Sequence, residues 1–208
     1  RVVPYVDMPL QHIAAGMLRT MGRGMTGRDT RALVGRIKAG IPGVAFRTNF
    51  IVGFPGETGE DFEELCRYVE EEPFDNLVVF AYEREPETTS HGMSGQVPVA
   101  TRRRRRARLL EIQQRLSHER LARRIGERLT VMIDGPAEAD HARTGPRQYA
   151  ARSAGSAWEV DGGVAVEGEH LEPGSLVSVR VTGAAAYDLF ARAETAPAAP
   201  FPILKGHA

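Results

Sequence analysis

Three apolar, β-branched runs that alternate with helical patterns constrain the fold of this chain most. The strands are expected at residues 2–8, 44–54 and 77–82, and the first two helices at residues 13–21 and 28–39. Thr58 and Asp61 can form a capping box that begins a third helix. Apolar strands joined by helices are typical of parallel βα units with right-handed crossovers. Three such strands form part of a sheet or barrel, so the pattern predicts an incomplete α/β domain.

The second half of the chain has a different pattern of predicted elements. A long arginine-rich helix is expected at residues 101–128, followed by short strands at residues 129–133, 148–154, 158–160, 164–166, 176–181 and 186–192. Turn signals lie at Asp134-Gly135 and at residues 161–163. This pattern predicts a small antiparallel β-barrel of the OB type. We therefore expect a first domain at residues 1–125, a barrel at 126–193 and a disordered Ala- and Pro-rich tail at 194–208.

The charges of the chain are segregated, although they sum to zero from 27 basic and 27 acidic residues. The net charges are about +6, −10, +8 and −4 for residues 1–53, 54–100, 101–128 and 129–208. Each block presents its own electrostatic field, so the neutral sum excludes no class of partner.

The only cysteine, Cys66, lies on the apolar stripe of the third helix, where we expect it to fill the core. A single cysteine excludes a disulfide framework or a multi-cysteine cluster supplied by this chain alone. No apolar run has the roughly 18 residues that a membrane span needs, and no secretory signal pattern follows Arg1. We expect a fragment of a cytoplasmic protein with no membrane partner.

Ligands of parallel βα folds gather at the carboxyl ends of the strands. Gln11 and His12 follow the first strand and offer amide and imidazole groups, although His12 could instead cap the next helix. The turn from Gly53 to Glu57 precedes a helix N-terminus that favours an anionic or electron-rich ligand, or is only a tight turn. Asn49 is polar within an apolar strand and could face a barrel lumen. The segment 82–89 after the third strand is a further candidate.

The arginine run at residues 102–106 could grip phosphate, but no aromatic residues interleave with it to stack bases. We favour a solvated helix face that lies opposite the acidic block of residues 54–100. The histidines at positions 91, 118, 141, 170 and 207 have no metal-ligand spacing, and we predict no metal site from them.

Several motifs together resemble the radical S-adenosylmethionine methylthiotransferases. They are YVDMPLQH, GMLRTMGRG, RTNFIVGFPGETGEDFEEL, FDNLVVFAYEREPET, QVP and QQRLS in the first domain, and VMIDGP and AWEVDG in the barrel. The last two are similar to the TRAM domain of that family. The PLQH, VVFAYERE and WEVDG segments resemble the branch that modifies a ribosomal protein more than the transfer-RNA branch. Two departures are Tyr82–Thr88, where relatives tend to read YSREEGT, and Trp158, where they tend to have proline.

The resemblance implies the carboxy-terminal part of a parallel (βα) radical SAM barrel followed by a TRAM barrel. It implies an enzyme that uses S-adenosyl-L-methionine and two 4Fe-4S clusters to insert a methylthio group at the β-carbon of an aspartate of small-subunit ribosomal protein twelve. The cluster ligands would lie outside this sequence, so we expect the fragment alone to be inactive. We expect Gln11, His12, Asn49, Gly53 and Glu57 to bind cofactor, and Arg147, Trp158 and Asp161 to bind substrate. No catalytic residue, sulfur source or electron donor is identified.

Two alternatives remain from the residues: an enzyme that modifies transfer RNA, and a non-catalytic module that binds RNA or protein. The barrel residues 129–192 carry nine acids and five arginines. A barrel that grips RNA is expected to be basic, because phosphate neutralisation dominates such binding. The acidic excess favours ribosomal protein twelve as the partner of the barrel and makes RNA the weaker alternative.

Overall fold

The computed structural model describes residues 2–137, 147–194, 198 and 201. The chain divides into two compact units, one of residues 6–116 and one of residues 117–208 together with residues 1–5. The expected tail at residues 194–208 falls almost entirely outside the described residues. Within the described part of the chain, no helix is both long and apolar enough to span a membrane.

The first unit is built on a three-stranded sheet in the order β1-β2-β3. The strands are β1 (Tyr5–Asp7), β2 (Ala45–Val52) and β3 (Asn76–Ala81). β2 and β3 are parallel, with Asn49 opposite Val78, which confirms the expected βα arrangement of these two strands. β1 is shorter than its predicted run of residues 2–8, chiefly because the chain bends at Pro4 before the strand begins.

Four α-helices and one short 3-10 helix belong to this part of the chain. They are α1 (Ala15–Thr20), α2 (Gly27–Gly40), α3 (Gly59–Glu71), η1 (Thr89–Gly92) and α4 (Val99–Ala122). The predicted capping box at the start of α3 is present, since the Thr58 hydroxyl accepts from the Asp61 N–H and the Asp61 carboxylate accepts from the Thr58 N–H. A second capping box, of Thr26 and Asp29, begins α2.

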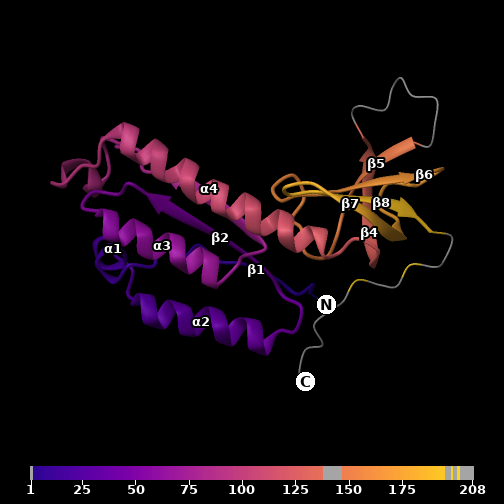
Figure 1. The fold of residues 1–208 in the computed structure, drawn as a ribbon, viewed down its shortest axis with the longest axis horizontal. Coiled ribbons are helices and arrows are strands. Elements are labelled where there is room, and N and C mark those ends of the chain that lie inside the picture. The colour runs from indigo at the N-terminus through magenta and orange to yellow at the C-terminus, as the bar shows by residue number, and fades with distance from the viewer. Residues whose placement is uncertain (1, 138–146, 195–197, 199–200, 202–208) are drawn as a thin grey trace. The chain divides into compact units, whose positions relative to one another are not determined.

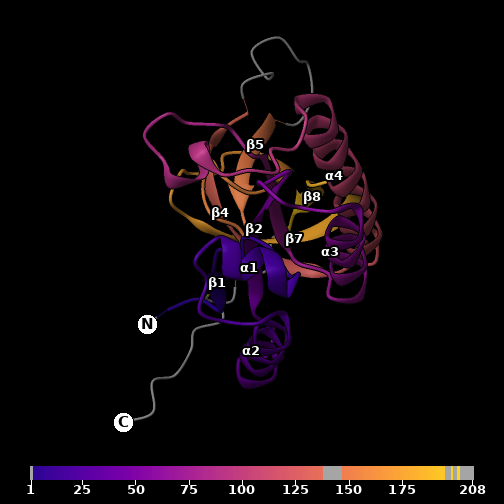
Figure 2. The same cartoon turned by 90° about the vertical axis from the view of Figure 1, so that its left-hand side faces the viewer.

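The core of the first unit lies between one face of the sheet and helices α3 and α4, which run beside β2 in both views (Figures 1 and 2), and it also takes in Val34 of α2. Phe46 and Phe50 of β2 are fully buried; Phe50 packs edge-on against Tyr68 and Phe74, and Phe46 packs at a tilt against Phe74. The alternation of β2 sends Arg47, Asn49 and Ile51 to the opposite face of the sheet, where they are only half-buried. This opposite face is the one available for a ligand.

The second unit is a closed barrel of β4 (Arg128–Pro136), β5 (Arg147–Arg152), β6 (Val164–Gly168), β7 (Leu176–Ala184) and β8 (Leu189–Ala193), drawn in orange and yellow in Figure 1. The ring order is β4-β5-β6-β8-β7. The prediction of a small barrel is confirmed, but the expectation of purely antiparallel pairing is wrong, since β6 and β8 are parallel. A closed ring with an odd number of strands cannot alternate direction throughout, so one parallel pair is required.

Two local predictions for the barrel are also wrong. Asp134-Gly135 lies inside β4, where a shift of register between Ile133 and Gly135 replaces the expected turn. A bulge of this kind accommodates the sharp bend of a barrel strand. Residues 158–160 form a turn between β5 and β6 instead of a strand, in which the Val160 N–H donates to the Ala157 carbonyl at 3.4 Å.

Candidate functional site

A cavity of about 510 Å³ lies at the carboxyl ends of the strands of the first unit. Its lining includes Gln11 from the loop after β1, Ile51 and Phe54 from the end of β2, and Ser90 and Met93 from the segment after β3. Thr20, Met21, Gly22, Arg23, Thr88 and Thr89 complete it. The cavity therefore forms where the three predicted loops meet, and Thr88 and Thr89 come from the predicted 82–89 segment.

Gln11 is held in an uncommon backbone conformation at the edge of this cavity. Its φ angle is 69°, which a residue with a side chain rarely adopts. The Gln11 N–H donates to the Asn49 carbonyl at 3.0 Å, and the Gln11 carbonyl accepts from the Ile51 N–H at 2.9 Å. These two bonds to β2 fix the backbone, and strained positions of this kind concentrate at ligand sites.

Two buried amide oxygens on this side of the sheet have no hydrogen-bond partner among the described residues: Oε1 of Gln11 and Oδ1 of Asn49. Asn49 and Ile51 project from the same face of β2, and Ile51 lines the cavity. A buried acceptor without a partner costs about 1–3 kcal/mol. The two oxygens are therefore suited to accept hydrogen bonds from a ligand with N–H or O–H groups.

His12 does not line the cavity. It is fully buried, and its Nδ1 accepts from the Ala14 N–H at 3.0 Å. Nδ1 consequently carries no proton, so Nε2 carries one and donates it to Oε1 of Glu57 at 3.2 Å. Both ring nitrogens of His12 are thus used within the protein, and its contact with cofactor stays a prediction.

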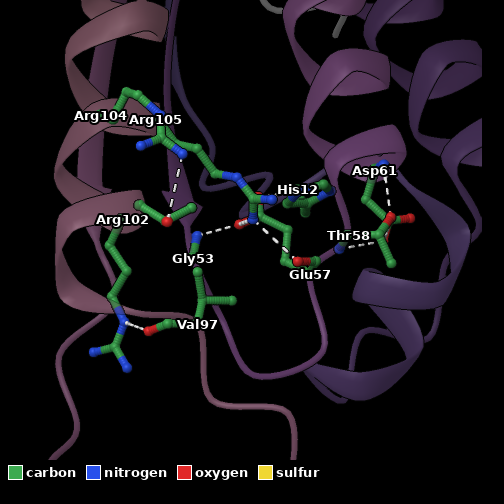
Figure 3. Close-up of polar contacts among 10 residues, drawn as sticks. His12, Gly53, Glu57, Thr58, Asp61, Val97, Arg102, Arg104 and Arg105 are labelled. Atoms are coloured by element: carbon green, nitrogen blue, oxygen red, sulfur yellow. Dashed lines mark hydrogen bonds and ion pairs between the residues drawn. The ribbon is translucent and has the colours of Figure 1, made fainter.

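Glu57 is likewise absent from the cavity lining, since its side chain is completely buried. Its Oε2 accepts from the Gly53 N–H and from Nη1 of Arg105, the latter at 2.6 Å (Figure 3). Arg105 also donates to the Glu57 carbonyl at 3.0 Å. Glu57 thus connects the loop after β1, the turn after β2 and helix α4, while its predicted contact with cofactor stays a prediction.

Gly53 lies in the left-handed region, with φ of 75°, directly against α4. A Cβ placed on Gly53 would lie 2.4 Å from Cγ of Arg102. Gly53 does not line the cavity. The structure gives Gly53 a role in packing, because only glycine allows the turn and α4 to approach this closely, and its cofactor contact stays a prediction.

The arginine run of α4 is not a simple solvated face, because part of it points into the protein. Arg102 is buried and donates to the carbonyls of Val97 and Tyr82 at 2.7 and 3.0 Å and to Oε1 of Gln96 at 3.2 Å. The Arg106 guanidinium donates to the Val79 carbonyl at 2.9 Å. The Arg105–Glu57 ion pair confirms the expected contact with the acidic block of residues 54–100. Arg103 and Arg104 are exposed to solvent.

Gln96 is a positioning residue that the sequence reading did not single out, although it belongs to the QVP motif. Its Nε2 donates to the carbonyls of Ser90 and Met93 at 2.9 and 3.2 Å. Because Ser90 and Met93 line the cavity and Arg102 holds the Gln96 amide oxygen, α4 fixes this wall through a chain of hydrogen bonds. The sequence does not reveal this role, because the hydrogen-bond partners of Gln96 are brought to it only by the folding of the loop and of α4.

Cys66 is confirmed as a core residue. It is buried among the apolar residues between the sheet and its helices. Burial, assisted by the negative charge of Glu63, raises the pKa of the thiol from its usual value near 9 to about 11. Among the described residues, no group of three or more His, Cys, Asp or Glu side chains is placed to hold a metal.

We expect Cys66 to react slowly with a disulfide reagent such as DTNB in the native protein. At pH 8 a pKa near 11 leaves the thiol protonated, and a rise of two units above the usual value reduces the thiolate roughly a hundredfold. Stopped-flow absorbance in buffer and in denaturing urea measures this difference. A native rate equal to the unfolded rate would contradict the burial of Cys66.

In the barrel unit, the predicted substrate residues do not form one cluster. Trp158 is 60% exposed in the loop between β5 and β6, beside the guanidinium of Arg152 at 5.8 Å. Asp161 belongs to the same loop, and its Oδ2 accepts from the Ala157 N–H at 2.8 Å. Arg147 begins β5, so it lies roughly 16 Å along the strand from Arg152 at ~3.3 Å per residue. Of the three residues, only Trp158 and Asp161 share a loop.

Comparison with known proteins covers both units. A family model described as the TRAM domain matches residues 125–193. A Sorangium cellulosum protein named ribosomal protein uS12 methylthiotransferase RimO is 44% identical over 190 residues, which are 91% of this chain and 38% of that protein. A protein of the same name from Anaeromyxobacter sp. (strain Fw109-5) is 43% identical over 190 residues, 91% of this chain and 39% of that protein.

Among solved structures, Escherichia coli coproporphyrinogen III oxidase (HemN), described as a radical SAM enzyme, has a TM-score of 0.46 and 18% identity over 55% of this chain and 27% of that chain. The chain spans about two fifths of the length of the curated relatives that it matches.

Proposed function

The chain belongs to the ribosomal protein uS12 methylthiotransferase family, and we propose that its first unit forms part of the S-adenosyl-L-methionine site of an enzyme that methylthiolates uS12. The observation that carries this proposal is the cavity at the carboxyl ends of the strands, which Gln11 lines with a buried, unpartnered amide oxygen. Asn49 is outside the lining, but it projects from the same face of β2 as the lining residue Ile51. As in the relatives' name, the substrate would be uS12, and the modified position would be the β-carbon of an aspartate.

The residues beside the cavity fit S-adenosyl-L-methionine. Its adenine and amino groups carry N–H donors, and the oxygens of Gln11 and Asn49 are acceptors without partners among the described residues. The side chains of Ile51, Phe54 and Met93 supply apolar walls that exclude water. When bound, S-adenosyl-L-methionine would supply a methyl group and a radical able to take hydrogen from an unactivated carbon.

The iron-sulfur clusters of this chemistry do not find ligands here. The chain has one cysteine, and that cysteine is buried in the core. A cluster needs several thiolates, so its ligands would come from residues outside this sequence. We therefore expect this segment alone to be inactive and to contribute cofactor and substrate contacts.

Within this proposal, the residues around Glu57 act on the cavity indirectly. The proton on Nε2 of His12, the Gly53 N–H and the Arg105 guanidinium all point to one carboxylate. Together they hold the loop after β1 and the turn after β2 in register with α4. The geometry of the cavity is thereby set before a ligand binds, which reduces the free-energy cost of ordering it.

Mass spectrometry of uS12 tests the proposed function. Ribosomes from cells with the full-length gene should contain uS12 heavier by a methylthio group that replaces hydrogen on one aspartate, and ribosomes from a deletion strain should not. Complementation with a gene that carries Gln11→Ala should restore little of the modification. Unmodified uS12 in the wild-type strain would refute the proposal.

For the barrel, we propose that the exposed loop of Trp158 and Asp161 contacts uS12 directly. An acidic excess over residues 129–192 favours a basic protein over transfer RNA. Trp158 is the only tryptophan of the chain, so its fluorescence reports binding to this loop. Exposed tryptophan is enriched in binding hot spots, which supports a contact here.

We expect uS12 to bind this chain more tightly than transfer RNA does at physiological salt. Titration followed by Trp158 fluorescence should show a blue shift with uS12, and competition between the two ligands ranks their affinities. By anisotropy with labelled uS12, Trp158→Ala should weaken binding, while Phe190→Ala, which removes an exposed aromatic residue of β8, should not. Tighter binding of transfer RNA would favour the RNA-modifying alternative.

A further inference from the structure

The first half of α4 carries a group of arginines that are exposed to solvent. Residues 99–110 contain six arginines and no acidic residue. Two of the six are used inside the protein, because Arg102 is buried among backbone carbonyls and Arg105 pairs with Glu57. The other four are exposed: Arg103, Arg104, Arg106 and Arg108. We call these four residues the outer arginine patch.

The charges of the patch are not paired with carboxylates. Within the described part of the chain, none of its four guanidinium groups forms an ion pair. Arg104 donates to the Thr101 hydroxyl at 3.5 Å, and Arg106 donates to the Val79 carbonyl at 2.9 Å. Both acceptors are neutral, so these bonds leave the positive charges of the patch in place.

Acidic residues of the neighbouring helix α3 do not pair with the patch. Glu70 of α3 pairs with Arg115, which belongs to the second half of α4. Glu63 of α3 raises the pKa of the Cys66 thiol and Arg108 lowers it, so both charges act on the same thiol. Among the described residues, however, no ion pair joins Arg108 to Glu63. The contacts of α3 with charged groups of α4 thus leave the patch unpaired.

The spacing within the patch is unfavourable for the helix itself. Side chains three or four residues apart are neighbours on a helix surface, and like charges at these positions destabilise the helix. Arg103 and Arg106 are three residues apart, and Arg104 and Arg108 are four residues apart. A surface that only needs to be soluble mixes charges of both signs. Repulsion that no contact within the protein offsets indicates a function outside it.

Phosphate is the anion that this arrangement matches. A guanidinium binds two phosphate oxygens through paired N–H donors. Arg104 and Arg108 are separated by about 6 Å along the helix axis, so they can contact different phosphates of one polymer. Residues 99–110 include no aromatic residue, so the patch is suited to the sugar-phosphate backbone and not to stacking on bases. This chemistry favours RNA over a partner protein with carboxylates.

We propose that the outer arginine patch binds the phosphate backbone of small-subunit ribosomal RNA. The choice of RNA rests on the proposed function, because a ribosomal protein lies on ribosomal RNA in its particle. RNA-bound uS12 then offers the enzyme a second contact that free uS12 lacks, so the RNA-bound form is the preferred substrate. Phosphate contacts alone give a Kd of roughly 1–100 μM at physiological salt, which agrees with tighter binding of uS12 than of transfer RNA.

Salt-dependent RNA binding by the full-length protein tests the patch. The variant carries Arg104→Gln and Arg108→Gln. The matched control carries Arg28→Gln and Arg36→Gln, two exposed positions of α2 that give the same change of net charge. Fluorescence anisotropy with a labelled helix of small-subunit ribosomal RNA is recorded between about 50 and 200 mM salt. The measurement needs no turnover.

The variant should lose two phosphate contacts. Each contact contributes roughly 0.7–0.9 to the slope of log affinity against log salt, so the slope should become shallower by about 1.4–1.8. Raising the salt fourfold should then weaken the wild type roughly tenfold more than the variant. The control should keep the slope of the wild type. Competition by intact small ribosomal subunits should show the same loss for the variant, and affinity for free uS12 should stay unchanged in both proteins.

A variant with the slope of the wild type would overturn the proposal, as would equal losses in the variant and the control. Weaker binding of free uS12 with unchanged RNA binding would also contradict it, because the patch would then contact protein. Modified uS12 in cells together with RNA binding that does not depend on the patch would refute this inference alone. RNA binding that depends on the patch, together with unmodified uS12, would refute the proposed function alone.

Discussion

Glu57→Gln is expected to lower the free energy of unfolding by about 3–5 kcal/mol, the usual result of removing one partner from a buried ion pair. The glutamine keeps the size of the side chain but not its charge. Arg105, whose side chain is 12% exposed, would then lose its only described carboxylate partner. The bond from the Gly53 N–H would also weaken, because a neutral amide oxygen is a poorer acceptor than a carboxylate.

Urea denaturation followed by far-ultraviolet circular dichroism measures this loss. Glu60→Gln is the matched control, because Glu60 is exposed in the first turn of the same helix and its removal should cost less than about 1 kcal/mol. A double variant, Glu57→Leu with Arg105→Met, should be more stable than either single variant, because it leaves no charge unpaired.

Glu57→Gln should also weaken the binding of S-adenosyl-L-methionine to the full-length protein. The loop that carries Gln11 is held in part by the bond between His12 and Glu57, which the substitution disturbs. Equal stability of Glu57→Gln and Glu60→Gln would show that the buried pair does not hold the site together.

Gly53→Ala is expected to destabilise the protein by about 2–5 kcal/mol, from the left-handed backbone and from overpacking against α4. The added Cβ would lie 2.4 Å from Cγ and 2.9 Å from Cβ of Arg102. Either the turn or α4 must shift. A shift of α4 would disturb the bonds from Arg102 to Val97 and Tyr82 and from Arg105 to Glu57, which hold the cavity walls.

Gly56→Ala separates the two causes. Gly56 has a similar φ of 86°, but the nearest atom to an added Cβ is Cε of Met17 at 3.7 Å, an ordinary contact. This variant should therefore show only the backbone cost of roughly 1–2 kcal/mol. The difference between the two variants in thermal or urea unfolding measures the close approach of α4, and equal losses would contradict it.

Much of the fold was predictable because it depends on local patterns. Periodicity located α2 within one residue at each end, and the Thr58 and Asp61 pair located the start of α3. Gln11 was correctly placed at the cavity, because residues after the strands of a parallel sheet share one edge. The parallel β6–β8 pair was not predictable from turn signals, since it follows from closing a ring of five strands.

The sequence by itself determined the family, the α/β unit followed by a small barrel, and the edge of the sheet at which the cavity lies. Only the tertiary structure decided what each polar residue does there. His12 and Glu57 hydrogen-bond to each other in the interior, and Arg102 and Arg105 point inward from α4. Arg23 lies in the lining of the cavity. The physical reason is that Arg105 and Glu57 are 48 residues apart. Periodicity shows which face of an element is buried, but the partner of a buried charge is fixed by the packing of distant elements.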